Sequence, residues 1–580
     1  MSLLPFGELA AYRPRRFVPG SVDFGTWTEI APLFDRLEAQ LKHCASLSEL
    51  ERWLLDWGEL EAALDEEGAR RYIAMTCHTD NEEAKQSYLA FVETIEPQLK
   101  PRQFQLSEQF LAHSGRAQLP ADRYAVHHRD TALKVELFRS ENVPLETEET
   151  KLGQQYQELS GSLTVTFRGV ERTLPQMAPY LEEPDRALRQ QAWELVARRR
   201  LQERDKFEAL FDALVDLRDR IATNAGFANY RDYSFRARRR FDYSSAECVE
   251  FHGTIEQEIM PLVKELQADR QRQLKLRELR PWDLEVDPAS RPPLRPFRDA
   301  GQLVERCQQL FDRIDPDLAG GFRKMQTLGL LDLANRKGKA PGGYQATLNE
   351  ARLPFIFMNA VGLQLDVETL LHEAGHAFHA LATREEDLYH YRNAPIEFCE
   401  VASMSMELLG NEHLEQFQSD AEARRARRTH LELIIKRFPW IATVDAFQHW
   451  IYQHRGHSRS ERRQAWLELM NRFGGLVDWT GHEETRANLW HRQLHIFLHP
   501  FYYVEYGIAQ LGALQVWANS KQDPAGALRA YQQGLALGGS RPLPELFRAA
   551  GCRFDFSAKT IRPLVELLRR ELDQSPSVSR

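Results

Sequence analysis

The chain has 580 residues, of which 43% are hydrophobic, and a formal net charge of -9. It is long enough to bury large cores, and it lacks the basic excess of a general nucleic-acid binder. No apolar run approaches the length of about 18 residues that crosses a bilayer, and Met1–Glu8 lacks the pattern of a secretory signal, so we expect a cytoplasmic protein with no membrane or nucleic-acid partner.

Helical periodicity dominates the chain. We expect a mainly α-helical protein, with an N-terminal helical domain over residues 1–195 and a second domain over residues 196–580. Prolines are too frequent between Arg280 and Arg298 for a continuous helix, so this segment is predicted to be an irregular connector. Apolar residues recur at intervals of three and four, with charges between them, over residues 30–42, 47–64, 81–99, 244–276 and 421–438.

Three short segments favour strands instead. Residues 162–167 alternate with β-branched side chains and end at the turn pair Arg168-Gly169. Residues 343–348 and 353–358 form a second candidate pair. An exposed strand edge here could hold an extended peptide by main-chain hydrogen bonds, with broad specificity as the result. The alternative for Gly342-Gly343 is a hairpin or entry turn with no substrate role.

Cysteines and basic runs suggest no separate activity. The six cysteines have no CxxC spacing and are expected to be reduced and mostly buried thiols. The basic runs Arg198–Arg200, Arg236–Arg240 and Arg424–Arg428 are interpreted as solvated helix faces or paired surface charges. The alternative is that a few of these arginines line a peptide groove and attract substrate carboxylates.

The motif His372-Glu373-Ala374-Gly375-His376 specifies a chemistry. Residues four apart share a helical face, so both imidazoles can bind one metal ion while Glu373 lies beside it. The flanking apolar residues are spaced as the buried stripe of a helix, and Asp366 is the expected N-cap. This pattern predicts a zinc hydrolase, in which the metal acidifies a water and Glu373 accepts its proton.

Such a site needs a third protein ligand. A metzincin would place a histidine ten residues after His372, but Ala382 is there, and His379 stands at that motif's glycine position. The metzincin interpretation therefore fails. His379 is expected to be a hydrogen-bonded histidine near the ligands or in the core rather than a ligand.

Downstream, Glu397, Glu400 and Glu407 lie in a stretch that is otherwise apolar or small, and offsets of three and seven place them on one helical face. Buried carboxylates should be paired or metal-bound. Glu400 is the predicted ligand, and Glu397 and Glu407 are predicted to orient the histidines. The alternative for the latter two is an ordinary surface position. Cys399 should face away from the metal.

Together, the 372–376 motif and the segment 398–407, Phe-Cys-Glu-Val-Ala-Ser-Met-Ser-Met-Glu, resemble the M3 metallopeptidases, the group of thimet oligopeptidase and oligoendopeptidase F. The resemblance is closest to the oligoendopeptidase F branch, loose before about residue 120 and firm from about residue 200 onward. It implies that Glu400 is the third ligand of one Zn²⁺ per chain. It also implies a multi-helical ellipsoid with a deep substrate channel and a small β-sheet beside the zinc-binding helix.

Two further segments are similar to parts of that family. The loop 336–344, which contains Gly342, Gly343 and Tyr344, is similar to the glycine-containing loop beside the family's substrate strand. The segment 500–506, Pro-Phe-Tyr-Tyr-Val-Glu-Tyr, is similar to its tyrosine segment.

The resemblance gives roles to residues in and near the tyrosine segment. A tyrosine hydroxyl is a suitable donor to an oxyanion. The implied catalytic groups are His495, Tyr502 and Tyr506, while His499 and Tyr503 are candidate substrate contacts, and His499 could replace His495. The alternative for each tyrosine is aromatic core packing.

The sequence therefore predicts a zinc metalloendopeptidase that cleaves internal bonds of short, unfolded oligopeptides, as a monomer or homodimer. One alternative is an exopeptidase or dipeptidase of the same type, and another is a non-catalytic peptide-binding protein of the same fold. Glu373 favours the enzyme, because a purely structural zinc site needs no base beside the metal.

Overall fold

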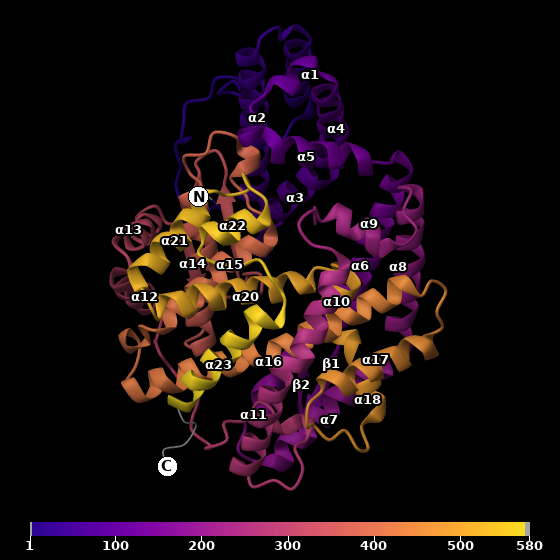
Figure 1. Cartoon of the computed structure of the whole chain (residues 1–580), viewed down its shortest axis with the longest axis vertical. Coiled ribbons are helices and arrows are strands. Elements are labelled where there is room, and N and C mark those ends of the chain that lie inside the picture. The colour runs from indigo at the N-terminus through magenta and orange to yellow at the C-terminus, as the bar shows by residue number, and fades with distance from the viewer. Residues whose placement is uncertain (1–2, 575–580) are drawn as a thin grey trace. The chain divides into compact units, whose positions relative to one another are not determined.

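Helices make up most of residues 3–574, which the computed structural model describes (Figure 1). The mainly helical class with small sheets is confirmed. Within this range, no helix combines the length and apolar character needed to cross a membrane. The chain forms two units, each built from three segments: Met1–Glu136, Leu294–Ala426 and Ala509–Phe554 in unit 1, and Leu137–Pro293, Arg427–Ile508 and Asp555–Arg580 in unit 2. The division at residue 195 stays a prediction.

Unit 1 contains the N-terminal helices and the helices that come before and after its sheet in the sequence. Its N-terminal core lies between α1, α2 and α4, where Trp53 and Trp57 are almost fully buried. Trp53 donates a hydrogen bond to the Leu37 carbonyl at 2.8 Å. The helices are α1 (Trp27–His43), α2 (Leu47–Cys77), α3 (Glu82–Ala90), α4 (Glu96–Ala112), α5 (Ala121–Leu137), α12 (Ala300–Ile314), α13 (Pro316–Thr327), α14 (Gln364–Ala382), α15 (Ile396–Asn411), α21 (Pro524–Ala536) and α22 (Leu543–Ala549).

A three-stranded sheet precedes α14. The predicted strand pair forms β4 (Tyr344–Leu348) and β5 (Leu353–Ala360), which are antiparallel. The sequence analysis missed β3 (Leu331–Ala334), which pairs parallel with β5 in the order β3-β5-β4. The central strand β5 is buried over its first six residues, and β4 lies at an edge.

Unit 2 is helical apart from one hairpin. The predicted strand forms β1 (Thr164–Phe167), and β2 (Val170–Thr173) returns antiparallel to it. Arg168 and Gly169 both have positive φ angles, as a two-residue type I′ turn requires. The helices are α6 (Val143–Gly161), α7 (Arg186–Gln202), α8 (Arg204–Asn224), α9 (Tyr230–Ala237), α10 (Ser245–Thr254), α11 (Met260–Gln273), α17 (Arg459–Phe473), α18 (Glu483–Ala487), α19 (Leu494–Leu498) and α23 (Ala558–Gln574).

Two helices contribute to both units: α16 (Asp420–Gln453) and α20 (Tyr503–Ser520). The predicted helices over 81–99 and 244–276 are each interrupted by a π-helical turn, Phe91–Ile95 and Ile255–Ile259. A proline follows each turn by two residues, and because proline has no backbone N–H it cannot continue the regular hydrogen-bond ladder.

Asp366 is not the N-cap of α14, and this prediction was wrong. The helix begins two residues earlier, at Gln364. The Asp366 carboxylate still caps it, because its Oδ2 accepts the backbone N–H groups of Leu363 and Val361, each at 2.8 Å. Acidic side chains are favoured in the first turn of a helix, and Asp366 lies in that turn rather than at the N-cap.

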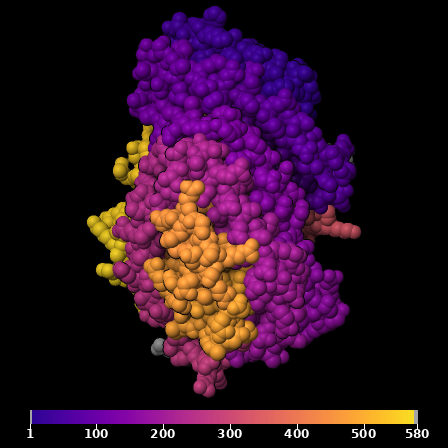
Figure 2. All heavy atoms as spheres, turned by 90° about the vertical axis from the view of Figure 1, so that its right-hand side faces the viewer, coloured from indigo at the N-terminus to yellow at the C-terminus, as the bar shows by residue number. Residues whose placement is uncertain are grey.

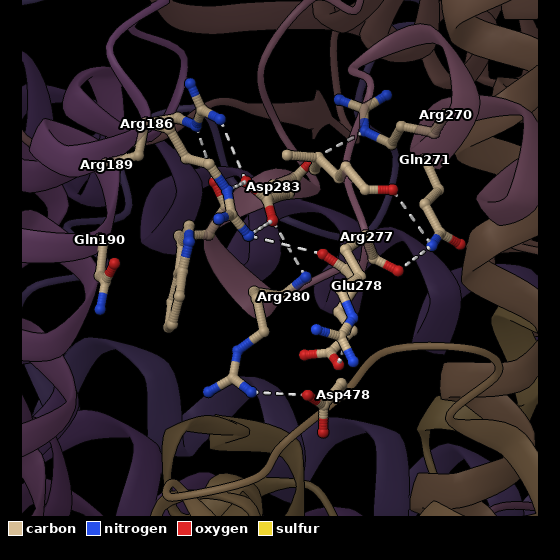
Figure 3. A network of polar contacts seen from close by, with 12 residues as sticks. Arg186, Arg189, Gln190, Arg270, Gln271, Arg277, Glu278, Arg280, Asp283 and Asp478 are labelled. Carbon is tan, nitrogen blue, oxygen red and sulfur yellow. Dashed lines mark hydrogen bonds and ion pairs between the residues drawn. The ribbon is translucent and has the colours of Figure 1, made fainter.

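The predicted connector after Arg280 contains a buried carboxylate that is hydrogen-bonded to several other segments of unit 2 (Figure 3). Asp283 is fully buried and accepts hydrogen bonds from Arg186 at 2.8 and 2.9 Å and from Arg189 at 3.1 Å. It also accepts the backbone N–H of Arg280 at 3.0 Å. Arg280 extends to Asp478 at 2.7 Å, so one buried acid joins α7, the connector and the chain beyond α17.

Figure 2 shows the segment with α17 and α18, coloured orange, beside purple and magenta segments of unit 2. Arg459 in α17 bonds Asp212 in α8 at 2.8 Å, and Arg472 bonds Glu256 at 2.6 Å. Ion pairs therefore fasten both ends of α17 to earlier helices of the same unit.

Replacing Asp283 with asparagine should destabilise the protein. The substitution leaves the buried Arg189 without its counter-charge, so the free energy of unfolding should fall by about 3–5 kcal/mol in chemical denaturation. Asp269→Asn, which breaks an exposed pair with Arg272, is the control and should cost about 1 kcal/mol or less. Equal effects of the two substitutions would contradict the assignment.

The stabilities of wild type and Asp283→Asn should depend differently on pH. Burial raises the pKa of Asp283, but the hydrogen bonds around it outweigh burial and hold this pKa below its ordinary value. A depressed carboxyl pKa stabilises the fold above the unfolded value of about 3.9, and this stabilisation is lost as pH falls through the folded value. The difference in unfolding free energy between wild type and Asp283→Asn should therefore shrink below about pH 4.

Candidate metal centre

The motif helix α14 follows β5 directly and packs on α15 (Figure 1). Its apolar residues Leu370, Leu371, Ala374 and Ala377 are fully buried, as the predicted stripe requires. The face that carries His372 and His376 is partly open, with side-chain exposures of 25% and 18%. The helix is thus anchored on one side and presents both imidazoles on the other.

Gly375 sets the distance between the two helices. A Cβ atom at this position would lie 2.5 Å from Ser403 Cα and 2.6 Å from the Ala402 carbonyl oxygen. Both are backbone atoms of α15, which cannot move aside as a flexible side chain could. Gly410 makes a second close approach from α15, where an added Cβ would lie 2.8 Å from the Leu371 side chain. The two backbones can approach this closely only because these residues are glycines.

Three predicted ligands come together across this contact. Nitrogen or oxygen atoms of His372, His376 and Glu400 all lie within 4.8 Å of one another. Glu400 Oε2 is 3.5 Å from His372 Nε2 and 3.9 Å from His376 Nε2. In a tetrahedral zinc site with bonds of about 2.0–2.1 Å, ligand atoms lie about 3.3 Å apart, so small side-chain adjustments would complete the geometry.

The second nitrogen of each imidazole is held from α15. His372 Nδ1 donates to Glu407 Oε1 at 2.6 Å, and the His376 ring donates to the Cys399 carbonyl. Ser403 Oγ donates to Glu400 Oε2 at 3.1 Å. Metal-binding histidines in proteins are oriented by such carboxylate and carbonyl partners. The residues present therefore fit a metal ion.

Glu373 occupies a different environment from the ligands. It is buried, and it accepts a hydrogen bond from the Gln345 backbone N–H in β4. Burial raises the pKa of Glu373 to about 7, with the positive charge of His372 partly opposing this and Glu400 adding to it. A carboxyl group with this pKa can both accept and release a proton near neutral pH.

The charge of the cluster also favours a cation. For the side chains alone, burial lowers the pKa of His372, but the hydrogen bond and charge of Glu407 and the charges of Glu400 and Glu373 outweigh it and raise this pKa to about 9. Three buried glutamates that hold a proton on an imidazole will equally attract a divalent ion in its place.

The remaining predicted neighbours of the ligands are buried. His379 packs its ring 6.0 Å from that of Phe398, and burial lowers its pKa to about 4, so it is neutral. Its Nε2 has no hydrogen-bond partner among residues 3–574. Glu397 is buried in the first turn of α15. Cys399 Sγ lies 3.4 Å from the Ala394 carbonyl and outside the ligand set.

The predicted substrate loop leads into β4. Gly342 has a φ angle of +98°, which favours glycine, and Asn359 Nδ2 donates to its carbonyl at 3.0 Å. Lys339, whose side chain is fully buried, bonds Asp332 at 3.0 Å and so fixes the loop to β3. Tyr344 stacks on Phe357 at 4.8 Å, and its hydroxyl lies 2.6 Å from Thr76 Oγ1. The Tyr344 side chain is thus part of the packing of unit 1.

In unit 2, the aromatic residues of the tyrosine segment gather around one histidine. The His495 ring lies 5.8 Å from Tyr502, 4.8 Å from Tyr503 and 5.9 Å from Tyr506, and His499 lies 6.2 Å from Tyr502. Burial lowers the pKa of His495 to about 4, and the nearby His499 and Arg238 lower it further, so His495 is neutral.

Two arginines shape this segment, and sequence reasoning missed them. Arg238 Nε donates to the Pro500 carbonyl at 2.9 Å, and Arg240 donates to the Phe501 carbonyl. Both pair with the buried Glu505. Phe501 adopts a φ angle of +63°, so the arginines hold a strained turn just before α20. The interpretation of this basic run as surface charge was wrong for Arg240, which is buried.

Two histidines one turn apart, a carboxylate from a facing helix and a buried glutamate beside them define the donor set of a metal-dependent hydrolase. The model of the family "Peptidase family M3" matches residues 179–565, and that of the "Peptidase M3 N-terminal domain" matches residues 24–138. The chain therefore belongs to peptidase family M3, as the sequence resemblance predicts.

Comparisons with individual proteins are consistent with this family. Oligopeptidase PepF of Bacillus subtilis (strain 168) is 27% identical over 246 residues, 39% of this chain and 35% of the relative, so the chain aligns with about a third of the length of that protein. A solved structure described as an oligoendopeptidase F is 29% identical, with a TM-score of 0.87 and coverage of 97% of this chain and 100% of the other. The structure of Pz peptidase A with an inhibitor is 27% identical, with a TM-score of 0.88 and the same coverage.

Gly375→Ala should separate α14 from α15. The added methyl group meets backbone atoms, so we expect a loss of about 1–3 kcal/mol in unfolding free energy together with weaker zinc binding in a competition titration. Gly320→Ala on α13 is the control, because a Cβ there meets nothing within 4 Å and alanine favours a helix. Unchanged zinc affinity in Gly375→Ala would refute the role of this contact.

Glu407→Gln should weaken metal binding without removing a ligand. The amide cannot carry the charge that orients and polarises His372, so zinc affinity should fall about 10–100-fold in the same titration. Glu412→Gln is the matched control, since Glu412 lies at the end of the same helix and accepts a bond from Trp517 instead. If both variants bind zinc equally well, Glu407 does not support the site.

Proposed function

We propose that this protein is a zinc-dependent endopeptidase that cleaves internal bonds of short, unfolded oligopeptides. The observation that carries the proposal is the buried Glu373 carboxylate beside the cluster of His372, His376 and Glu400. Membership of peptidase family M3 and the similarity to an oligoendopeptidase F structure support it. One zinc ion is proposed for this site because its donor set is two imidazoles and one carboxylate.

Bound zinc would lower the pKa of a water molecule to about 7 and polarise the peptide carbonyl. His372, His376 and Glu400 would hold the ion, and Glu407 and the Cys399 carbonyl would keep the two imidazole rings in place. Glu397 and His379 are proposed to pack around this arrangement. Three protein ligands leave one position for water or substrate, as in other catalytic zinc sites.

Glu373 is proposed to move the proton. With its pKa raised to about 7 by burial, the carboxylate can accept a proton from the attacking water and deliver it to the leaving amine. The Gln345 N–H keeps the carboxylate oriented. Because this donor belongs to β4, the position of the base is tied to the strand edge.

That strand edge is proposed to hold the substrate. In the order β3-β5-β4, the strand β4 pairs with β5 on one side only, and Gln345 directs its N–H to Glu373 rather than to β5. An extended peptide could therefore add to the β4 edge by main-chain hydrogen bonds beside the base. Gly342 and Gly343 would let the peptide backbone approach closely, while Tyr344 shapes the start of the strand.

The roles that the resemblance gives to unit 2 are kept as part of the proposal. Tyr502 and Tyr506 would donate hydrogen bonds to the oxyanion of the tetrahedral intermediate, and the neutral His495 would assist them. His499 and Tyr503 are proposed substrate contacts. The arrangement as a monomer or homodimer and the cytoplasmic location stay predictions.

Glu373→Gln tests the proposal. The amide can accept no proton, so kcat for a mixed peptide library, read by mass spectrometry, should fall about 10²–10⁴-fold while zinc content stays unchanged. Wild type should cleave internal bonds of short peptides and leave a folded protein intact. Glu385→Gln, an exposed side chain elsewhere in unit 1, is the control.

Three results would count against the proposal. Equal turnover by wild type and Glu373→Gln would remove the base from the mechanism. Release of single terminal residues or dipeptides only would favour an exopeptidase. Peptide binding without any cleavage by wild type would favour a binding protein of this fold.

A further inference from the structure

A second set of metal-binding side chains lies inside unit 2, on two packed helices. Cys248 and His252 stand four residues apart on α10, and Asp445 and His449 stand four residues apart on α16. Residues at this spacing share a helical face. Each helix thus presents two potential ligands to the other.

The four side chains meet in the interior. Ligand atoms of Cys248, Asp445 and His449 all lie within 4.8 Å of one another. His449 Nε2 is 3.3 Å from Asp445 Oδ2, close to the separation of two ligands around a tetrahedral zinc ion. His252 Nε2 lies 2.8 Å from the same oxygen, at hydrogen-bonding distance.

This cluster is buried, and some of its polar atoms have no hydrogen-bond partner among the described residues. Asp445 and Cys248 are fully buried, and His449 is 3% exposed. Within residues 3–574, Asp445 Oδ1 and His449 Nδ1 have no hydrogen-bond partner, and His449 Nε2 has only its 3.3 Å contact with Asp445 Oδ2. The rings of Phe235 and Phe501 lie 5.8 and 5.3 Å from that of His449. Buried polar atoms without partners are costly, and a bound ion would satisfy these.

The charges in the cluster also favour a bound metal ion. A buried carboxylate needs a counter-charge, and the side chains of His252 and His449 are in contact with that of Asp445. A divalent ion bound by one thiolate and one carboxylate would leave the cluster without net charge. Thiolate and imidazole ligands together select zinc among the common divalent ions of the cell.

We propose that Cys248, Asp445 and His449 bind a structural zinc ion that is distinct from the ion at His372 and His376. His252 donates a hydrogen bond to the Asp445 carboxylate and orients it, as partners of metal ligands commonly do. The ion joins α10 to α16 across 193 residues of sequence and takes no part in the peptidase reaction.

Zinc content provides the first test. The full chain, loaded with zinc and dialysed, should contain about two zinc ions per chain by inductively coupled plasma mass spectrometry. Cys248→Ser and His449→Gln should each contain about one, and His376→Gln, which damages the other site, should also contain about one. Cys307→Ser is the control, because Cys307 is equally buried but belongs to no ligand cluster of the described chain, and it should keep both ions.

Cobalt gives a test whose main readout is made on the wild-type protein. The proposed catalytic ligands include no cysteine, so only the α10–α16 cluster can give a thiolate-to-cobalt charge-transfer band in the near ultraviolet. Cobalt-loaded wild type and His376→Gln should both show this band. Cys248→Ser should lack it while retaining weaker visible bands from the other site.

The outcomes separate the two sites. Wild type with about one zinc ion, no thiolate band with cobalt, and the same zinc content in Cys248→Ser would overturn the second site and leave the peptidase proposal intact. A thiolate band together with peptidase activity that does not depend on Glu373 would support the second site and overturn the peptidase mechanism.

Discussion

The close approach of α14 and α15 at Gly375 is the constraint on which the candidate metal site depends. The histidines lie on one helix, and Glu400, Glu407 and the Cys399 carbonyl lie on the other. A carboxylate side chain reaches only a short distance from its backbone, so every ligand and every orienting partner depends on the spacing of the two axes. A Cβ atom at position 375 would lie within 2.6 Å of two backbone atoms of α15. The glycine inside the motif is therefore as necessary to the geometry as the histidines that define it.

The same helix pair also solves an electrostatic problem. Buried glutamates are expensive unless they are paired, and α15 buries Glu397, Glu400 and Glu407 in one helix. His372 compensates part of this charge by its bond to Glu407, and the raised pKa of His372 records how strongly the surroundings demand a positive charge. A divalent ion would meet that demand better than a proton does, because it would contact Glu400 and both imidazoles at once.

Local spacing was readable from the sequence, whereas long-range pairing was not. The helix α14 and the strands β4 and β5 were predicted because four-residue and two-residue periodicities are local properties of the sequence. Glu400, which lies beside both histidines, was chosen as the predicted ligand because offsets along α15 place it on one face with Glu407 and because the segment resembles a known family. The strand β3 was missed because its parallel pairing with β5 leaves no local pattern. Arg240 was misread because a run of arginines looks the same whether it is solvated or bonded to the carbonyl of a strained turn.

The α10–α16 cluster also combines a local spacing that the sequence reveals with a long-range contact that it does not. Cys248 and Asp445 are almost 200 residues apart in the sequence, and neither four-residue pair is distinctive alone. The signal that could have identified the cluster is that two buried helices each carry two ligand-type residues one helical turn apart. Both clusters use this device, and burial distinguishes their functions. The imidazoles on α14 keep 18% or more of their side-chain surface, and a buried base stands beside them. In the α10–α16 cluster, Cys248 and Asp445 are fully buried and His449 is 3% exposed, which suits an ion that fastens helices rather than one that meets a substrate.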